Sequence, residues 1–327
     1  MKSLKNKKIR WGIIGLGNIA NKFAQDLLTL DDAELYAVAS RSQQKADDFA
    51  QKYHAVKAYD NYQALAKDVN IDAVYIATPH ALHEENTLLC ITQGIAVLCE
   101  KPLAMNADQV KMMIATAKDN NVLLMEALWT YFLPHYQFVL NELAKKTYGE
   151  ILKIEADFGY IQEFDQGSRL FKKSLGGGSL LDIGIYPIFC ALSTLGKADS
   201  IDAHATFFDN AADSSCTMRF NYHNGATASL KSTFLESSPC KAVFYCERGT
   251  IKINRGFQSP STITLITEGN EQTLDFNCKT NGYDYEIIHF NELLRQGKKE
   301  SNIMTFEFSH DLIETLDSVR KLIGLQY

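Results

Sequence analysis

The sequence predicts an α/β protein of two domains: a doubly wound parallel sheet, then an α+β domain built on a mostly antiparallel sheet. Strand-like and helix-like segments alternate from residue 9 to 126, which is typical of parallel strands joined by crossover helices. After Trp129, apolar and polar residues alternate in successive runs with few helices between them. We therefore expect domains at residues 1–128 and 129–327.

The elements of the first domain follow from hydrophobic spacing. Short runs rich in Val, Ile, Leu and Ala predict buried strands, and apolar residues every three or four positions predict helices. The predicted strands are Ile9–Ile14, Glu34–Ser40, Ala73–Ala77, Ile95–Cys99 and Val122–Met125. The predicted helices are Ile19–Leu30, Gln43–Tyr53, His83–Gln93 and Ala107–Lys118.

The second domain is expected to begin with a helix and to continue as strands. Asn224-Gly225 lies between two alternating runs and predicts a hairpin turn. The predicted strands are Ile151–Tyr160, Ile201–Phe208, Ser215–Tyr222, Ala226–Phe234, Ala242–Cys246 and Thr262–Thr267. The predicted helices are Pro134–Lys146, Tyr283–Arg295 and Ser309–Leu322.

A glycine turn directly follows the first strand and reads Gly15-Leu16-Gly17-Asn18-Ile19-Ala20. Gly15 permits a tight turn, Gly17 lets a ligand approach the backbone, and small Ala20 lets the helix pack closely on the sheet. The free N–H groups at the helix start favour an anion. The turn, with Asn18 and Ile19, therefore predicts a site for a dinucleotide pyrophosphate. The alternative is a purely structural turn.

Composition excludes some classes of protein. The formal net charge of the 327 residues is −6, which argues against nucleic acid as a partner. No stretch approaches the roughly 20 apolar residues of a membrane span, and no apolar signal segment precedes the glycine turn. The seven cysteines form no pair or cluster with metal-ligand spacing, so we expect no metal site, reduced thiols and a cytoplasmic protein.

The end of the second strand selects the cofactor. NAD-specific sites usually place a carboxylate there for the ribose 2′-hydroxyl, whereas this chain has Ser40-Arg41-Ser42. A guanidinium and hydroxyl groups suit a 2′-phosphate. We therefore predict NADP as the cofactor, with NAD as the alternative. Arg41 could instead be a solvated residue at a helix start.

Two further segments follow strands at the edge where ligands bind in open α/β sheets. Thr78 and Pro79 are expected to border the nicotinamide, with His80 and His83 close by. Glu100-Lys101-Pro102 places a charged pair beside the same region, and a cis bond before the proline is compatible with this segment. We assign Thr78, Pro79, His83, Glu100 and Lys101 to the cofactor site. A lysine there could polarise a reacting hydroxyl, or it could be a surface ion pair.

Together with the glycine turn, three segments resemble the Gfo/Idh/MocA oxidoreductase family: Ala77-Thr78-Pro79, Glu100-Lys101-Pro102 and the run from Gly176 to Tyr186. The resemblance covers essentially the whole chain and includes Tyr285–Phe290. It implies an N-terminal Rossmann domain and a C-terminal domain with a large open sheet. It also implies a homodimer or homotetramer.

Many members have His where this chain has Tyr186, and the chain is similar to the branch containing dimeric dihydrodiol dehydrogenase and NADP-dependent D-xylose dehydrogenase. That resemblance implies catalytic roles for Lys101 and Tyr186. Tyr186 would accept a proton in oxidation and donate it in reduction, with Lys101 orienting the substrate hydroxyl and lowering the tyrosine pKa. Tyr131 stands where relatives commonly have Arg, so the resemblance does not carry over a particular substrate.

Three residues are candidate substrate contacts. Asp182 lies four positions before Tyr186, so both side chains share a face if this stretch is helical, and the carboxylate could bind a sugar hydroxyl. Trp129 and Tyr160 could provide a stacking wall for a sugar or an arene. Each also has a structural alternative: Asp182 as a helix-start carboxylate, and the aromatic residues as packing.

The sequence thus favours an NADP-dependent oxidoreductase acting on a CH–OH group of a small polyol, sugar or dihydrodiol. Two other readings stay open. One is a relative that uses tightly held NAD internally for glycoside hydrolysis, and the other is a non-catalytic regulator that senses the cofactor. The substrate, the physiological direction and the oligomeric state are not fixed by the sequence.

Overall fold

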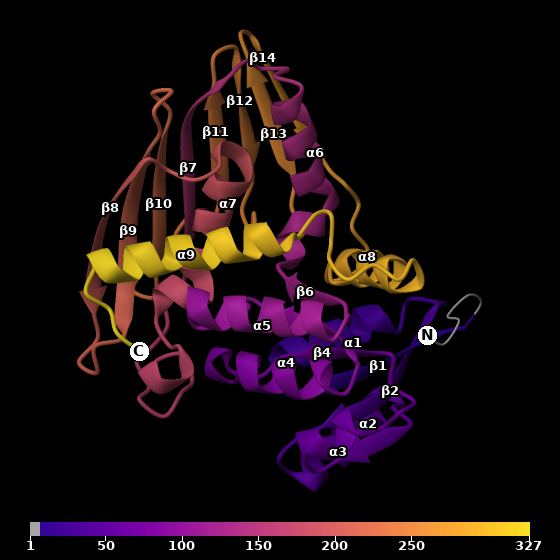
Figure 1. Cartoon of the computed structure of the whole chain (residues 1–327). Helices are drawn as coiled ribbons and strands as arrows, with labels where there is room; N and C mark the ends of the chain where they lie inside the picture. The colour runs from indigo at the N-terminus through magenta and orange to yellow at the C-terminus, as the bar shows by residue number, and fades with distance from the viewer. Residues whose placement is uncertain (1–6) are drawn as a thin grey trace. The chain divides into compact units, whose positions relative to one another are not determined.

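The computed structural model describes residues 7–327; the N-terminal residues 1–6, where we predict no signal segment, lie outside it. The chain divides into two compact units. The first comprises the chain up to Trp129 together with Lys279–His310, and the second comprises Thr130–Cys278 and Asp311–Tyr327. Each unit contains one sheet (Figure 1).

In the described residues, the first unit contains a six-stranded sheet in the order β3-β2-β1-β4-β5-β6. All of its neighbouring strands pair in parallel, as predicted. The order reverses between β1 and β4, and ligands of doubly wound sheets bind at the carboxyl ends of the strands at such a point. The strands are β1 (Ile9–Ile14), β2 (Ala33–Ala39), β3 (Lys57–Tyr59), β4 (Ala73–Ile76), β5 (Ala96–Glu100) and β6 (Leu124–Ala127).

The crossover helices begin at side-chain caps in several places. Ser42, Asn61 and Asn106 each accept a hydrogen bond from a backbone N–H in the first turn. The helices are α1 (Asn18–Leu27), α2 (Gln43–Tyr53), α3 (Tyr62–Ala66), α4 (His83–Ile91) and α5 (Ala107–Asp119). β3 and α3 were not predicted from the sequence, because they are too short to show a periodic spacing of apolar residues.

A helix from near the chain's end returns to the first unit. α8 (Asp284–Arg295) packs on α1, and the indole nitrogen of buried Trp11 donates a hydrogen bond to Asn291 over 3.1 Å. Asp26 of α1 accepts a hydrogen bond of 2.8 Å from the backbone N–H of Tyr283. These contacts explain why Lys279–His310 belongs to this unit.

The second unit holds an eight-stranded sheet within the described residues, in the order β14-β13-β12-β11-β7-β10-β9-β8. β7 and β10 pair in parallel and the other neighbours are antiparallel, which confirms the predicted mostly antiparallel sheet. β12 and β14 were not predicted. The strands are β7 (Ile151–Gly159), β8 (Ser200–Phe207), β9 (Asp213–Asn221), β10 (Thr227–Thr233), β11 (Ala242–Cys246), β12 (Gly249–Ile253), β13 (Ile263–Thr267) and β14 (Asn270–Leu274).

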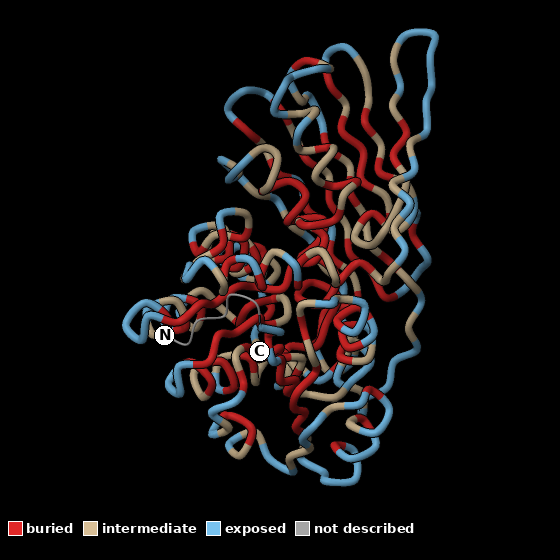
Figure 2. The backbone as a smooth tube through the Cα atoms, turned by 90° about the vertical axis from the view of Figure 1, so that its right-hand side faces the viewer, coloured by how far each residue is buried: buried red, intermediate tan, exposed pale blue. Residues whose placement is uncertain are grey.

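Helices cover one face of this sheet. α7 (Ile185–Leu195) packs on β7 and β10, and α6 (Pro134–Ala144) contacts β12. The opposite face is polar, because the residues that alternate with buried Met218, Phe220 and Leu230 include Thr217, Arg219 and Ser229. Figure 2 shows buried backbone through the strands and exposed loops at their ends.

The stretch Lys173–Leu195 is long and apolar enough to cross a membrane by length and composition alone, which we did not expect from the sequence. Its most apolar window is 94% buried inside the structure. Burial against the sheet therefore accounts for this composition. α9 (Phe306–Leu322) starts in the first unit, and its residues from Asp311 onward belong to the second.

Candidate functional site

In the glycine turn after β1, Gly15 and Gly17 are glycines for different reasons. Gly15 has φ +90°, and a Cβ there would lie 2.7 Å from the carbonyl carbon of Ala77, so the turn packs against the end of β4. A Cβ on Gly17 would meet no atom of the described chain within 4 Å. Gly17 also begins α1 without a side-chain cap from the described residues. An open, uncapped helix start beside a tight turn fits the predicted phosphate site.

Asn18 and Ile19 form the first positions of α1. Asn18 is exposed and Ile19 is half-buried, so the backbone of this first turn borders solvent. Ala20 is fully buried, as its predicted packing role requires. These positions would hold a pyrophosphate through backbone N–H groups.

Of the residues that follow β2, the serines make local hydrogen bonds and the arginine is exposed to solvent. The Ser42 hydroxyl caps α2, and the Ser40 hydroxyl accepts a hydrogen bond of 3.3 Å from the Ser42 N–H. Arg41 is exposed between them. Burial raises the pKa of Tyr62, and the Arg41 charge partly offsets this effect. The structure thus leaves the Arg41 guanidinium at the ligand-binding edge of the sheet, while Ser42 serves the helix.

His83 joins the ends of two strands. It is fully buried, with one ring nitrogen 2.9 Å from the carbonyl oxygen of Thr78 and the other 2.8 Å from that of Pro102. Asn86 donates a hydrogen bond of 3.2 Å to the Thr78 hydroxyl. The structure therefore gives His83 a bracing role, and its predicted contact with the cofactor stays a prediction. His80 is also buried, at 6% exposure.

Glu100 ends β5 at the same edge. Its carboxylate accepts hydrogen bonds from the Tyr75 hydroxyl and, over 3.2 Å, from the backbone N–H of Lys101. The Lys101–Pro102 peptide bond is cis, which the sequence analysis allowed. Thr78 and Pro79 thus follow β4, Glu100 and Lys101 stand at the end of β5, and His83 at the start of α4 links the two segments.

A second carboxyl group lies beneath this segment. Glu126 of β6 is 2% exposed, and its Oε1 accepts a hydrogen bond of 2.9 Å from the N–H of Leu103. Burial raises the pKa of Glu126 to about 7. No role for Glu126 was predicted from the sequence.

In the second unit, a wide helical turn leads into α7 and carries the predicted residues. The turn Leu180–Gly184 is π-helical, and Asp182 and Tyr186 are 9% and 7% exposed. The Asp182 carboxylate lies 3.6 Å from the Arg169 guanidinium. Pro187, the third residue of α7, directly follows this π-helical turn, and its missing N–H fits the irregular hydrogen-bond pattern there.

Phe158 lies between Tyr160 and Tyr186 and is near both aromatic rings. The ring centroids of Phe158 and Tyr186 are 5.7 Å apart, and those of Phe158 and Tyr160 are 6.0 Å apart. Burial and the nearby Asp182 carboxylate raise the pKa of Tyr160 to about 12. The structure therefore brings Tyr160, Asp182 and Tyr186 together in one unit.

The glycines before this turn are closely packed. Gly176–Gly178 are all buried, and their N–H groups bond to the carbonyl oxygens of Lys173, Lys172 and Leu170. A Cβ on Gly177 would lie 2.6 Å from the Lys172 nitrogen, and one on Gly178 would overlap the Asp213 carboxylate. Close packing explains these glycines.

Trp129 is packed rather than open. It is 9% exposed and stacks on Tyr283 with ring centroids 4.5 Å apart. This contact fits the packing role that we kept as the alternative, and the predicted stacking of Trp129 on a substrate stays a prediction. Tyr131 lies in the second unit with its ring centroid 5.1 Å from that of Phe189.

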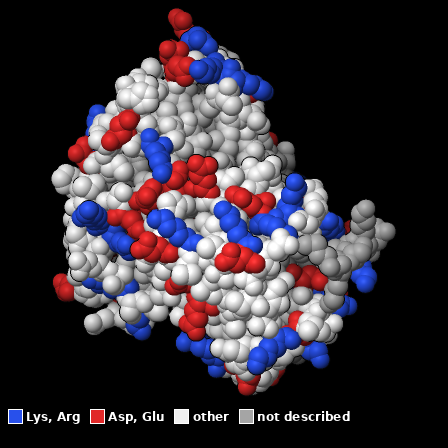
Figure 3. Space-filling view, in the orientation of Figure 1, with Lys and Arg blue, Asp and Glu red and all other residues white. Residues whose placement is uncertain are grey.

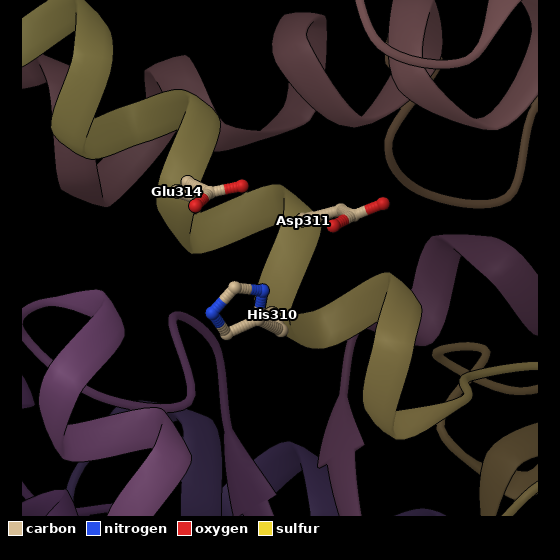
Figure 4. A group of neighbouring side chains, drawn as sticks. All are labelled: His310, Asp311 and Glu314. Carbon is tan, nitrogen blue, oxygen red and sulfur yellow. The ribbon is translucent and has the colours of Figure 1, made fainter.

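Two other features do not belong to this site. A cavity of about 750 Å³ lies at the amino ends of β4 to β6, at the opposite edge of the sheet. On α9, ligand atoms of His310, Asp311 and Glu314 lie within 4.8 Å of one another (Figure 4). The Lys197 ammonium is already 2.6 Å from Asp311 and 2.9 Å from Glu314, so ion pairing explains these carboxylates.

Two protein-family models match this chain. A model described as "Oxidoreductase family, NAD-binding Rossmann fold" matches residues 9–128, and one described as "GFO/IDH/MocA C-terminal domain" matches residues 136–252. The chain belongs to the Gfo/Idh/MocA oxidoreductase family. This confirms the resemblance and the fold class inferred from the sequence.

Individual relatives agree. The chain is 36% identical to trans-1,2-dihydrobenzene-1,2-diol dehydrogenase of Xenopus tropicalis over 97% of this chain and 99% of the relative. It is 33% identical to the enzyme of that name from Homo sapiens over 98% of both chains. Among solved structures, KijD10, a 3-ketoreductase from Actinomadura kijaniata in complex with NADP and TDP-benzene, matches with a TM-score of 0.87 and 26% identity over 97% of this chain and 98% of that chain.

This Gfo/Idh/MocA member is therefore an oxidoreductase whose first unit is an NAD(P)-binding Rossmann domain. The open Gly17 position and the uncapped start of α1 fit a dinucleotide, and exposed Arg41 fits the ribose end. When bound, the nicotinamide accepts or donates the hydride.

On the face shown in Figure 3, Lys and Arg are interspersed with Asp and Glu.

Sequence reasoning missed four buried carboxyl groups of this oxidoreductase: Asp26, Glu126, Asp213 and Glu286. Asp213 of β9 accepts hydrogen bonds from Ser179 and Leu180. Glu286 of α8 is fully buried, neither of its oxygens has a hydrogen-bond partner in the part of the chain that the structure describes, and burial raises its pKa well above the usual range. A carboxylate inside an apolar run was the available signal for Glu126.

Proposed function

We propose that this protein transfers a hydride between NADP and a CH–OH group of a sugar or a cyclic diol. The observation that carries the proposal is the similarity to dihydrodiol dehydrogenases over nearly the whole length of both chains. The Glu100-Lys101-Pro102 segment supports it, because it lies at the carboxyl end of β5, where ligands of such sheets bind.

The preference for NADP rests on the end of β2. Arg41 is exposed there, and no carboxylate stands at residues 39–42 to repel a 2′-phosphate. A guanidinium forms strong paired hydrogen bonds with phosphate oxygens. The NADP bound by the similar 3-ketoreductase supports the same choice.

Lys101 and Tyr186 have distinct roles in the proposed reaction. In oxidation, the Lys101 ammonium donates a hydrogen bond to the reacting oxygen and favours its anionic form. Tyr186 accepts the hydroxyl proton while the C–H hydride leaves for the nicotinamide, and the oxygen's electron pair completes the carbonyl bond. In reduction, Tyr186 returns that proton. Asp182, 9% exposed and close to Tyr160, is proposed to bind a further substrate hydroxyl.

The test is NADP reduction across a panel of pentoses, hexoses, inositols and trans-dihydrodiols. Tyr186→Phe and Lys101→Met are expected to lower kcat by about a hundredfold or more, as loss of a proton-transfer or polarising group does. Tyr148→Phe and Lys67→Met are matched controls outside the site and should retain wild-type rates. Variants within about threefold of wild type would refute the assigned roles. Nucleotide binding without net turnover across the panel would refute the proposed function.

We also propose a cytoplasmic homodimer or homotetramer. The free thiols of all seven cysteines, which lie in the described part of the chain, support a reducing compartment. The polar outer face of the second unit's sheet is the surface offered for assembly, with Arg219 and Asp202 opposite each other on β9 and β8. Light scattering on a sizing column measures the oligomeric state, and a monomer at micromolar concentration would contradict it.

A further inference from the structure

Glu126 is a carboxyl group in an otherwise apolar strand. β6 reads Leu124-Met125-Glu126-Ala127, and the Glu126 side chain is 2% exposed. Removing a carboxylate from water is costly unless hydrogen bonds or an opposite charge compensate. The neighbours of this carboxyl group therefore indicate what it does.

Its hydrogen bonds reach the segment that carries Lys101. Glu126 Oε1 accepts a hydrogen bond of 2.9 Å from the N–H of Leu103, two residues after Lys101. The nearby Ser309 hydroxyl of α9 also favours the ionised form and lowers the pKa of Glu126 against the larger effect of burial. Glu126 is also the register partner of Cys99 in the parallel pair of β5 and β6, so the two strands bring it close to the turn that follows β5.

The second carboxyl oxygen of Glu126 and the charged residues near it determine how readily Glu126 ionises. Oε2 is buried and has no hydrogen-bond partner among the residues that the structure describes. The charge of Glu100 opposes ionisation and the charge of Lys101 favours it, while the Cys99 thiol lies on the same side. Burial opposes ionisation most strongly, and the resulting pKa of Glu126 is about 7.

We propose that Glu126 is a positioning residue that fixes the Lys101–Leu103 segment and, when ionised, keeps the Lys101 ammonium charged. Interaction between two titrating groups is mutual, so a lysine that favours the carboxylate is itself held in its cationic form by that carboxylate. The consequence for turnover rests on the role proposed above for Lys101. The electrostatic link between the two side chains does not.

The first test needs neither cofactor nor turnover. NMR of isotope-labelled glutamate carboxyls should show one group that titrates near pH 7, absent from Glu126→Gln and present in Glu307→Gln. Gln retains an oxygen for the Leu103 N–H and removes only the charge. Glu307 is exposed on α9, so its replacement is the matched control. The Lys101 amine, assigned through Lys101→Arg, should titrate about half a pH unit or more lower in Glu126→Gln.

The second test uses the pH dependence of kcat/KM. Loss of the carboxylate is expected to remove an inflection near neutral pH and to lower kcat/KM about threefold or more above it, the factor that corresponds to half a pKa unit, whereas Glu307→Gln keeps the wild-type profile. A Glu126 carboxyl titrating near its ordinary value, or a Lys101 titration unchanged in Glu126→Gln, would overturn the proposal. An intact titration link with a fully active Lys101→Met enzyme would instead overturn the role proposed above for Lys101.

Discussion

The carboxylate of Asp213 lies 2.7 Å from the backbone nitrogen of Leu180, although 33 residues separate them in the sequence. The same carboxylate accepts a hydrogen bond of 2.8 Å from the Ser179 hydroxyl. The turn Leu180–Gly184 has no side-chain cap from Ser179 at its start. Asp213 therefore caps, from a neighbouring strand, the helical segment that carries Asp182 and Tyr186.

Replacing Asp213 is expected to affect stability and turnover together. Asp213→Ala leaves two buried donors without their charged acceptor and should lower the free energy of unfolding by about 3 kcal/mol. Asp213→Asn keeps one acceptor oxygen, so it should lose about 1 kcal/mol and retain more of the wild-type kcat. Denaturant unfolding and NADP-linked kinetics measure both. Equal stability of the alanine variant and wild type would contradict the capping role.

Gly15 and Gly17 form a matched pair that separates folding from binding. Gly15→Ala places a methyl group 2.7 Å from the Ala77 carbonyl carbon at φ +90°, so it should cost more than about 2 kcal/mol of stability. Gly17→Ala meets nothing within 4 Å among the described residues and should stay within about 0.5 kcal/mol of wild type.

NADP titration completes this comparison. The Gly17→Ala methyl group would occupy the space predicted for the phosphates, so we expect about tenfold weaker NADP binding, a loss of about 1.4 kcal/mol. Fluorescence titration of NADPH measures the affinity, and thermal unfolding measures the stability. A Gly17→Ala protein that binds NADPH as wild type does would argue against a phosphate site at this turn.

The parallel sheet was predictable because its signals are local. Each strand of the first unit except β3 is a short apolar run next to a helix whose apolar residues recur with the helical period. The glycine turn shows which of these strands opens the dinucleotide-binding fold. β3 and α3 are shorter than one hydrophobic period. The return of α8 was not predictable, because it depends on partners such as Trp11 and Asn291, which lie 280 residues apart.

The same distinction holds for the site. Local motifs predicted that Thr78 and Lys101 follow neighbouring strands at one edge of the sheet, and the structure places them there. The roles of Glu126 and Asp213 come from backbone N–H groups that distant segments bring to them. The bracing of two strand ends by His83 also depends on the fold, since its sequence position allowed a ligand contact equally well.

The preference for NADP can be tested at one exposed residue. Arg41→Ala should lower kcat/KM for NADP about tenfold or more, because a charge-assisted hydrogen bond to a phosphate is lost, and should leave kcat/KM for NAD nearly unchanged. Lys67→Ala removes an exposed cation from the opposite edge of the same sheet and serves as the control. An Arg41→Ala enzyme with an unaltered ratio of the two values would remove Arg41 from the cofactor site.

The buried carboxyl of Glu126 should also make stability depend on pH. Its pKa rises from an ordinary value of 4.5 to about 7 on folding, so between these values the folded state binds more protons than the unfolded state. The free energy of unfolding therefore falls as pH rises through this window, by up to about 3 kcal/mol from this group.

Glu126→Gln cannot titrate, so its advantage over wild type should be absent near pH 4 and should grow until about pH 8. Denaturant unfolding at a series of pH values measures this difference, with Glu307→Gln as the control for removing a glutamate charge from the surface. A stability difference between Glu126→Gln and wild type that does not change with pH would show that this carboxyl titrates alike in both states. The enzyme would then keep a charged Glu126 at no cost to its fold, contrary to the burial and the unpartnered Oε2 seen among the described residues.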